Sequence, residues 1–212
     1  MAGEERWVTF DCYGTLIDWN GGIRRQLARV FGEERADELL ERYHELEPEL
    51  EADGSRSYRE VLTEAMRRLG APVGEEEALA QSLPSWQPFP EVPQALAEAR
   101  ERGWQLGILS NTDREFIDAS MQLLGAPFEL AIVASEIGSY KPGLNHWRAF
   151  EERIGRLPDV HVAASLFHDI RPANELGLPS VWINRLGEKP GPRPTIEQPT
   201  LTGLADSLEE AA

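Results

Sequence analysis

The sequence predicts an α/β protein: a doubly wound, Rossmann-like parallel sheet with a small all-helical cap domain inserted after the first strand. From about residue 92 onward, short apolar runs alternate with helical apolar spacing, which is typical of parallel strands joined by right-handed helical crossovers. Before that point, one strand-like run at 7–10 is followed by about seventy residues with helical spacing only. We therefore expect a core domain made of 1–16 and 89–212, and a cap domain at 17–88.

The individual elements follow from the same two periodicities. Apolar residues at helical spacing predict cap helices at about 23–31, 39–50, 58–69 and 75–83. Short runs rich in apolar and β-branched residues predict further strands at 104–109, 130–134, 160–167 and 180–184. Core helices are expected at about 92–102, 116–124, 147–154, 173–176 and 201–208. The proline-rich tail at 189–199 is expected to be extended.

Composition limits the partners and the location of the protein. The net charge of −16 argues against nucleic acid and against an anionic membrane as partners. No apolar stretch is long enough to cross a membrane, and the acidic segment 1–6 lacks the apolar region of a secretory signal. The single cysteine, Cys12, excludes an internal disulfide and fits a reducing cytosol, so we expect a cytoplasmic protein. The sequence leaves the oligomeric state open; a homodimer is one expectation, because symmetric dimers are common.

Polar residues follow four of the predicted strands, where the carboxyl ends of parallel strands meet at one edge of a sheet. In chain order they are Asp11, Ser110 with Asn111, Lys141, and His168 with Asp169. A carboxylate at the end of a buried strand is costly unless something pairs with it or uses it. Lys141 would keep Asp11 ionised by lowering its pKa. Each residue alone has a structural alternative, such as a helix cap or a surface turn, but the ordered set predicts a nucleophile site.

Four segments resemble the four motifs of the haloacid dehalogenase-like hydrolase superfamily. They are Phe10 to Leu16, Leu109 to Asn111, Tyr140 to Pro142, and His168 through Asn174. The resemblance covers the whole chain, including an insert of the all-helical cap type. It implies a hydrolase with Asp11 as the nucleophile.

The residue two positions after the nucleophile separates the branches of this superfamily. Phosphatases carry a second aspartate there as the acid for the leaving alcohol, whereas this chain has Tyr13, which cannot act as an acid near neutral pH. The segment therefore resembles the (S)-2-haloacid dehalogenase branch, whose halide needs no proton. By that resemblance, Asp11 attacks the halogen-bearing carbon of a small anionic 2-haloacid. Water then hydrolyses the resulting ester, and no cofactor is needed.

The resemblance also implies roles for residues around the nucleophile. Thr15, Ser110 and Lys141 would hold the nucleophile and the substrate carboxylate, with Tyr13 beside the substrate. The family's halide-binding arginine corresponds to Arg42, assisted by Asn111, and Trp147 stands at the position of a family tyrosine. The structural alternative for Arg42 is an exposed helix residue paired with Glu38 or Glu45. Aromatic residues either line a small apolar pocket or pack in the core: Trp19, Tyr43, Trp86 and Trp147.

The fourth motif departs from the dehalogenase pattern, in which a serine, an asparagine and an aspartate fall on Asp169, Arg171 and Asn174. We expect Asp169, with His168, to help activate water, and Asn174 to lie at the catalytic site. Under an alternative, Asp11, the Tyr13 carbonyl and Asp169 hold Mg²⁺, as in phosphatases of the superfamily. A metal-independent dehalogenase is favoured. A Mg²⁺-dependent phosphatase for a small metabolite, and a non-catalytic binding module on the same scaffold, stay open.

Overall fold

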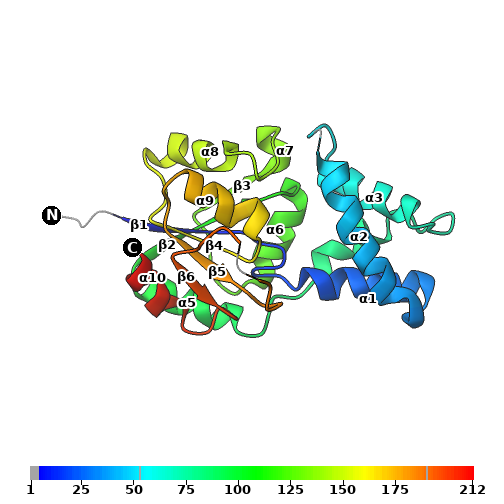
Figure 1. Cartoon of the computed structure of the whole chain (residues 1–212), viewed down its shortest axis with the longest axis horizontal. Helices are drawn as coiled ribbons and strands as arrows, with labels where there is room; N and C mark the ends of the chain where they lie inside the picture. The colour runs from blue at the N-terminus through cyan, green and yellow to red at the C-terminus, as the bar shows by residue number, and fades with distance from the viewer. Residues whose placement is uncertain (1–4, 53, 190) are drawn as a thin grey trace.

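The computed structural model describes residues 5–52, 54–189 and 191–212 (Figure 1). Most of the acidic segment 1–6, on which no secretory signal was expected, lies outside the described residues. The described strands form a six-stranded sheet in the order β3-β2-β1-β4-β5-β6, and every pairing is parallel. Their bounds are β1 Arg6–Phe10, β2 Trp104–Ser110, β3 Leu130–Val133, β4 Val160–Ala163, β5 Ser180–Ile183 and β6 Ile196–Gln198.

The strand order reverses beside β1, and this reversal positions the site. The chain runs from β1 to β2 and β3 on one side, then returns to β4 on the other side of β1. Phe10, the last residue of β1, pairs with Ile108 of β2 and with Val162 of β4. The loops that follow these three strands therefore open into one crevice at the carboxyl edge of the sheet.

Helices cover both faces of the sheet, so the doubly wound α/β class is confirmed. In Figure 1, α8 and α9 lie on one face, and α5 and α10 lie on the other. The helix bounds in the core are α5 Val92–Glu101, α6 Arg114–Leu123, α7 Ala134–Ile137, α8 Asn145–Ile154, α9 Arg171–Glu175 and α10 Leu204–Ala211. Strands β1, β2, β4 and β5 are buried on both faces along most of their length, as their largely apolar sequences require, whereas the edge strand β6 is not.

Four helices between β1 and α5 lie beyond the carboxyl edge of the sheet (Figure 1). They are α1 Trp19–Phe31, α2 Ala36–Glu51, α3 Tyr58–Arg68 and α4 Ala78–Ser82, with short 3₁₀ turns at Glu33–Arg35 and Leu83–Ser85. We refer to this segment as the cap; the domain limits 17–88 remain a prediction. Its helix α3 begins with a capping box formed by Ser57 and Glu60.

A core carboxylate ties the cap to the sheet. Asp113, at the start of α6, accepts hydrogen bonds from the backbone N–H groups of Tyr58 (3.0 Å) and Arg59 (2.9 Å). These donors belong to the first turn of α3, where backbone N–H groups lack helical partners and the helix dipole favours a negative charge. The position of α3 over the crevice is therefore fixed by a residue of the core.

One strand prediction needs correction. The fourth strand was expected to reach Phe167, but β4 ends at Ala163, because Ser165 accepts a hydrogen bond from the N–H of His168 and starts a helical turn at Leu166–Ile170. The tail was expected to be extended, and part of it, β6, also pairs with β5 as an edge strand that was not predicted. No helix in the described part of the chain combines the length and the apolar composition that a membrane span requires.

Candidate active site

Asp11 leaves β1 at the floor of the crevice with both carboxylate oxygens bound. Its Oδ1 accepts a hydrogen bond from Lys141 Nζ (2.9 Å), and its Oδ2 accepts one from Thr15 Oγ1 (2.8 Å). The Thr15 hydroxyl in turn accepts the backbone N–H of Ala164 at 2.9 Å. The turn between Asp11 and Thr15 passes through Gly14, whose φ of +90° is favourable for glycine alone. Asp11 is only 8% exposed, so its orientation is set by these contacts.

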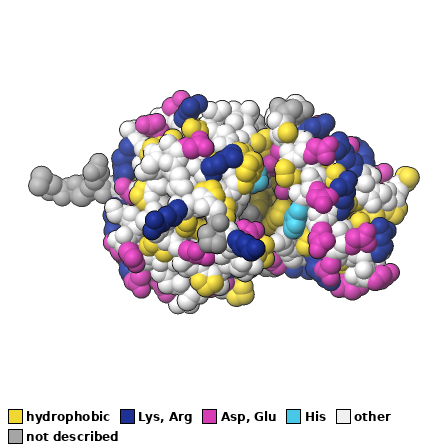
Figure 2. All heavy atoms as spheres, viewed as in Figure 1, with side chains coloured by type: hydrophobic (Ala, Val, Ile, Leu, Met, Phe, Trp, Pro, Cys, Tyr) yellow, Lys and Arg dark blue, Asp and Glu magenta, His cyan; other side chains and the backbone are white. Residues whose placement is uncertain are grey.

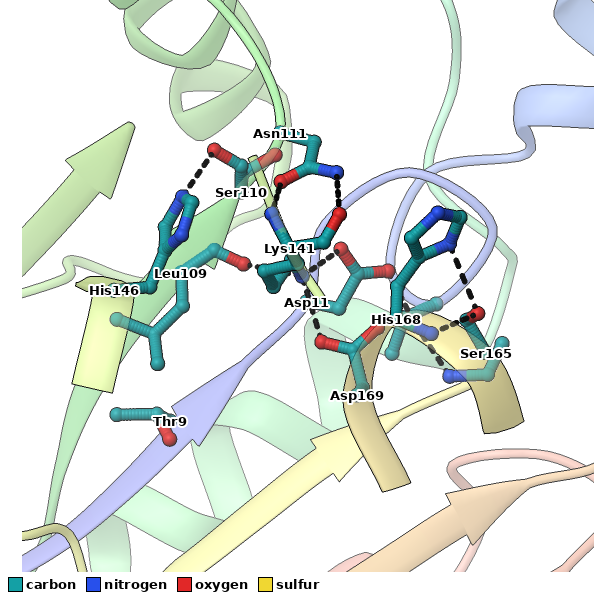
Figure 3. Close-up of polar contacts among 12 residues, drawn as sticks. Thr9, Asp11, Leu109, Ser110, Asn111, Lys141, His146, Ser165, His168 and Asp169 are labelled. Atoms are coloured by element: carbon teal, nitrogen blue, oxygen red, sulfur yellow. Dashed lines mark hydrogen bonds and ion pairs between the residues drawn. The ribbon is translucent and has the colours of Figure 1, made fainter. Parts of the chain in front are cut away.

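Lys141 places its ammonium group between two carboxylates (Figure 3). Besides Asp11, its Nζ donates to Asp169 Oδ1 (2.7 Å) and to the Leu109 carbonyl (2.9 Å), so all three protons are used. Burial by itself would lower the pKa of Lys141, but the Asp11 and Asp169 carboxylates raise it above the usual value. The side chain of Asn111 holds the Lys141 backbone, accepting from its N–H (2.6 Å) and donating to its carbonyl (3.0 Å).

Asp169 continues this network into the sheet. Its Oδ1 contacts His161 Nε2 at 3.0 Å, and His161 Nδ1 contacts the hydroxyl of Thr9 at 2.9 Å. Burial alone would raise the pKa of Asp169, but Lys141 and His161 hold it well below its usual range. Its second oxygen, Oδ2, is buried without a hydrogen-bond partner among the described residues. His161 was not among the predicted site residues, although a histidine inside the apolar run Val160–Ala163 was a signal for such a contact.

Ser110, the last residue of β2, offers an unused hydroxyl to the same site. Its Oγ is buried and has no hydrogen-bond partner in the described part of the chain. Its carbonyl lies 3.1 Å from His146 Nε2; because a carbonyl only accepts, Nε2 carries the proton. Burial and the charge of Lys141 lower the pKa of His146 to about 3, so this imidazole is neutral at physiological pH.

A cavity of about 570 Å³ separates these residues from the cap, and Figure 2 shows the surface hollowed between the two parts. Its size is within the usual range for small-molecule sites. Core residues that line it include Asp11, Tyr13, Ser110, Asn111, Lys141, His168 and Asp169, and cap residues include Trp19, His44, Glu47, Glu51 and Tyr58.

Comparison with known proteins identifies the family. A sequence model described as haloacid dehalogenase-like hydrolase matches residues 5–165. The chain belongs to the haloacid dehalogenase-like hydrolase family. The predicted superfamily is thereby confirmed.

Several relatives of this family member are dehalogenases. The (S)-2-haloacid dehalogenase of Pseudomonas sp. (strain YL) is 28% identical, with 97% of this chain and 95% of that protein covered. Haloacetate dehalogenase H-2 of Moraxella sp. (strain B) is 26% identical, with 93% of this chain and 95% of that protein covered. A phosphoserine phosphatase of Thermus thermophilus is 31% identical over a shorter region, 61% of this chain and 54% of that protein. Among solved structures, L-2-haloacid dehalogenase from Xanthobacter autotrophicus shares the fold, with a TM-score of 0.84, 20% identity and coverage of 99% of this chain and 100% of that chain.

Three residues that the family resemblance suggested lie away from the cavity. Arg42 points outward from α2, where its side chain is 58% exposed and pairs with Glu45, as the structural alternative held. Trp147 is fully buried on α8 and packs edge-on against His161 at 5.2 Å. Asn174 is exposed on α9 and does not line the cavity. None of the three lines the cavity: Arg42 and Asn174 are exposed to solvent, and Trp147 packs in the core.

The fourth motif divides at the end of β4. Asp169 lies six residues after the last residue of that strand and lines the cavity. Asn174, where the resemblance placed the family's aspartate, lies farther along on α9, outside the cavity.

The contacts between Asp11 and Asp169 suit an ammonium group better than Mg²⁺. Three of their four carboxylate oxygens already accept hydrogen bonds or ion pairs, and the Lys141 Nζ lies directly between the two groups. Only Asp169 Oδ2 is left without a partner in the described part of the chain. Across residues 5–52, 54–189 and 191–212, no group of three or more His, Cys, Asp or Glu side chains is arranged to hold a metal ion.

The aromatic alternatives divide between cavity and core. Trp19 lines the cavity, whereas Trp86 is buried in the main core. Tyr43 is buried too, but its hydroxyl donates to Glu47 at 3.0 Å. Tyr13 lines the cavity while its hydroxyl bonds to Ser120 Oγ at 2.9 Å. Burial raises the pKa of Tyr13 well above its usual value, so it cannot replace the acid of the phosphatases.

Proposed function

We propose that this chain is a hydrolase that uses Asp11 as a nucleophile and that it removes halide from a small 2-haloacid through an aspartyl-ester intermediate. The observation that carries the proposal is the fixed Asp11 carboxylate, held by Lys141 and Thr15 at the floor of the cavity between core and cap. The dehalogenase relatives support the leaving group. Tyr13 stands where the phosphatases have a proton-donating aspartate and does not itself act as an acid, which fits a leaving group that departs without a proton.

The proposed reaction consists of two displacement steps. A carboxylate oxygen of Asp11 forms a bond to the substrate carbon, and the halide leaves with the bonding electron pair. Water then attacks the Asp11 carbonyl carbon, one water proton passes to the departing 2-hydroxy acid, and the other is released. The net reaction consumes one water and yields the hydroxy acid, halide and a proton.

Two groups beside Asp11 are proposed to receive the proton from the attacking water. Asp169 Oδ2 is buried and without a partner within the described residues, so it has an acceptor site to offer. Burial lowers the pKa of His168, which leaves its imidazole neutral and able to accept a proton. Its Nδ1 is engaged with Ser165 Oγ at 3.1 Å, which leaves Nε2 for this role.

The contacts redistribute the roles that were first expected. Lys141 uses its three protons on Asp11, Asp169 and the Leu109 carbonyl, so it holds the nucleophile and has no donor left for the substrate carboxylate. The Ser110 hydroxyl is the group proposed to meet that carboxylate. Arg42 lies outside the cavity, so Asn111 is the remaining proposed halide contact. Its amide already donates to the Lys141 carbonyl (3.0 Å) and to Glu51 Oε2 (3.4 Å), so it would meet the halide by giving up the longer bond, to Glu51.

The test measures fluoride, chloride and bromide release from haloacetates and from both enantiomers of 2-chloropropanoate. Wild type is compared with Asp11→Asn, and single turnover in ¹⁸O-water followed by peptide mass spectrometry checks for label in Asp11. We expect release by wild type, loss in the variant, and label in the Asp11 peptide. Phosphate release from small phosphate esters, with Mg²⁺ or EDTA, is measured in parallel. Mg²⁺-dependent phosphate release without halide release would refute the proposal in favour of a phosphatase, and no Asp11-dependent turnover would favour a binding module.

A further inference from the structure

Two glutamates of the cap turn toward the nucleophile while the other acidic residues of their helix face solvent. Glu47 and Glu51 lie one helical turn apart on α2, and both line the cavity opposite Asp11. Glu51 is only 8% exposed. The remaining acidic side chains of α2 are exposed: Asp37, Glu38, Glu41, Glu45 and Glu49. The inward pair therefore differs from the general acidity of the chain and needs its own explanation.

Each inward carboxyl is anchored through one oxygen. Glu47 Oε1 accepts hydrogen bonds from the hydroxyls of Tyr43 (3.0 Å) and Tyr58 (2.8 Å), and Trp19 Nε1 supports Tyr58 by donating to its hydroxyl at 3.0 Å. Glu51 Oε2 accepts from Asn111 Nδ2 at 3.4 Å. Within the described residues no hydrogen bond reaches the second oxygen of either glutamate, so each carboxyl keeps an acceptor for a ligand.

Neither Lys141 nor Arg185, which line the cavity in the described part of the chain, is paired with these glutamates; Arg185 is bound to Glu91 at 2.7 Å. Lys141, which is close enough to affect Glu51, is already committed to Asp11 and Asp169. Neither Glu47 nor Glu51 forms a salt bridge in the described part of the chain. Burial raises the pKa of Glu47 to about 7; burial and the neighbouring Glu47 raise that of Glu51 to about 9. Burial is the largest cause of both shifts, so a cation bound between the two carboxyls would favour their ionised forms.

A separate feature of the cavity indicates where the other end of a ligand would bind. The Ser110 side chain lines the cavity, is 1% exposed, and has an Oγ without a hydrogen-bond partner among the described residues. Ser110 is adjacent to Asn111 (Figure 3), and the amide of Asn111 donates to Glu51. A small molecule could therefore contact Ser110 and the nucleophile at one end and the glutamate pair at the other.

We propose that Glu47 and Glu51 recognise a primary ammonium group on the substrate. The inference rests on the proposed function and adds the substrate class: a small carboxylic acid that carries its leaving group near Asp11 and an amine toward the cap. An ammonium group has three donors and one positive charge; the donors match the two free carboxyl oxygens, and the charge would favour the ionised form of the carboxyls when the ligand binds. A plain haloacid leaves both unsatisfied.

The first experiment measures binding with probes that have no leaving group, so it does not depend on turnover. Isothermal titration calorimetry on the wild-type chain compares 3-aminopropanoate with propanoate, and 4-aminobutanoate with butanoate. We expect at least one amino acid to bind about tenfold or more tightly than its partner acid. Equal binding within both pairs, or no saturable binding of either amino acid at millimolar concentrations, would overturn the inference.

Matched variants test whether Glu47 and Glu51 cause the preference for the amino acid over its partner acid. Glu47→Gln and Glu51→Gln keep the side-chain shape and are expected to remove most of the preference. Glu41→Gln makes the same charge change on the exposed face of α2 and should leave the preference unchanged. Thermal melts verify that each variant is folded. A preference that persists in the double variant Glu47→Gln/Glu51→Gln would also overturn the inference.

A turnover comparison separates this inference from the proposed function. Halide release from 4-amino-2-chlorobutanoate is compared with release from 2-chlorobutanoate, and we expect kcat/KM about tenfold higher for the amino compound. Equal Asp11-dependent release from both would leave the dehalogenase proposal standing and overturn the ammonium site. No release from either, with a binding preference that depends on Glu47 and Glu51, would overturn the leaving group and support the ammonium site.

Discussion

Replacing Glu51 with glutamine should stabilise the protein increasingly as the pH rises. The pKa of Glu51 is raised from its ordinary value of 4.5 to about 9 by burial and by Glu47. Between these values the folded chain holds a proton on Glu51 that the unfolded chain has released. The free energy of unfolding is therefore highest at low pH for this group and falls as the pH rises toward about 9. Glutamine carries no such proton, so the variant lacks this loss.

The size of the effect follows from that difference in proton binding. A full proton difference changes the free energy of unfolding by about 1.4 kcal/mol for each pH unit. The stability advantage of Glu51→Gln is its free energy of unfolding minus that of wild type. From about pH 5.5 to about pH 7.5, this advantage would grow by up to about 3 kcal/mol. Water in the cavity and the nearby Lys141 charge reduce the cost of ionisation, so we expect growth of about 1 to 3 kcal/mol.

Urea unfolding of wild type, Glu51→Gln and Glu41→Gln at about pH 5.5, 6.5 and 7.5 measures this difference directly. Titrating groups that do not interact with Glu51 contribute equally to wild type and variant, so they cancel in the comparison. The repulsion between Glu47 and Glu51 is removed by the substitution and is part of the measured difference. The advantage of Glu51→Gln should rise with pH, whereas that of Glu41→Gln should stay flat because its side chain is exposed. A flat or falling advantage for Glu51→Gln would show that the carboxyl is ionised in the folded protein and would refute the reasoning.

Two further substitutions test the contacts around the nucleophile. Lys141→Met leaves Asp11 and Asp169 buried without their shared cation, so it should lower the free energy of unfolding by about 3 to 5 kcal/mol and abolish turnover, measured by urea unfolding and halide release. Full activity in that variant would contradict the role given to the ammonium group. Arg42→Ala should change kcat/KM by less than about twofold, since its side chain pairs with Glu45 outside the cavity; a loss of about a hundredfold would mean that Arg42 reaches the substrate during turnover.

The sequence alone determined the parts of the fold that depend on local pattern. Apolar runs predict the five longer strands because a strand buried on both faces must be apolar throughout. Polar residues at strand ends predict where Asp11, Ser110 and Lys141 meet, because parallel strands direct their carboxyl ends to one edge. The tail strand β6 was missed because three residues carry too little pattern, and it forms only by pairing with β5.

Side-chain direction was decided by the tertiary structure. The family resemblance placed Arg42 in the site. Arg42 and Glu47 both belong to α2, however, and only Glu47 faces the cavity. The hydrophobic face of α2 sets that phase by packing against its neighbours, and a charged residue near the edge of that face can point either way until the helix is docked. The same holds for His161, whose contact with Asp169 depends on where β4 ends. The sequence determines the residue types and the edge of the sheet at which the polar ones gather. Packing between elements far apart in the chain determines which of them reach the nucleophile.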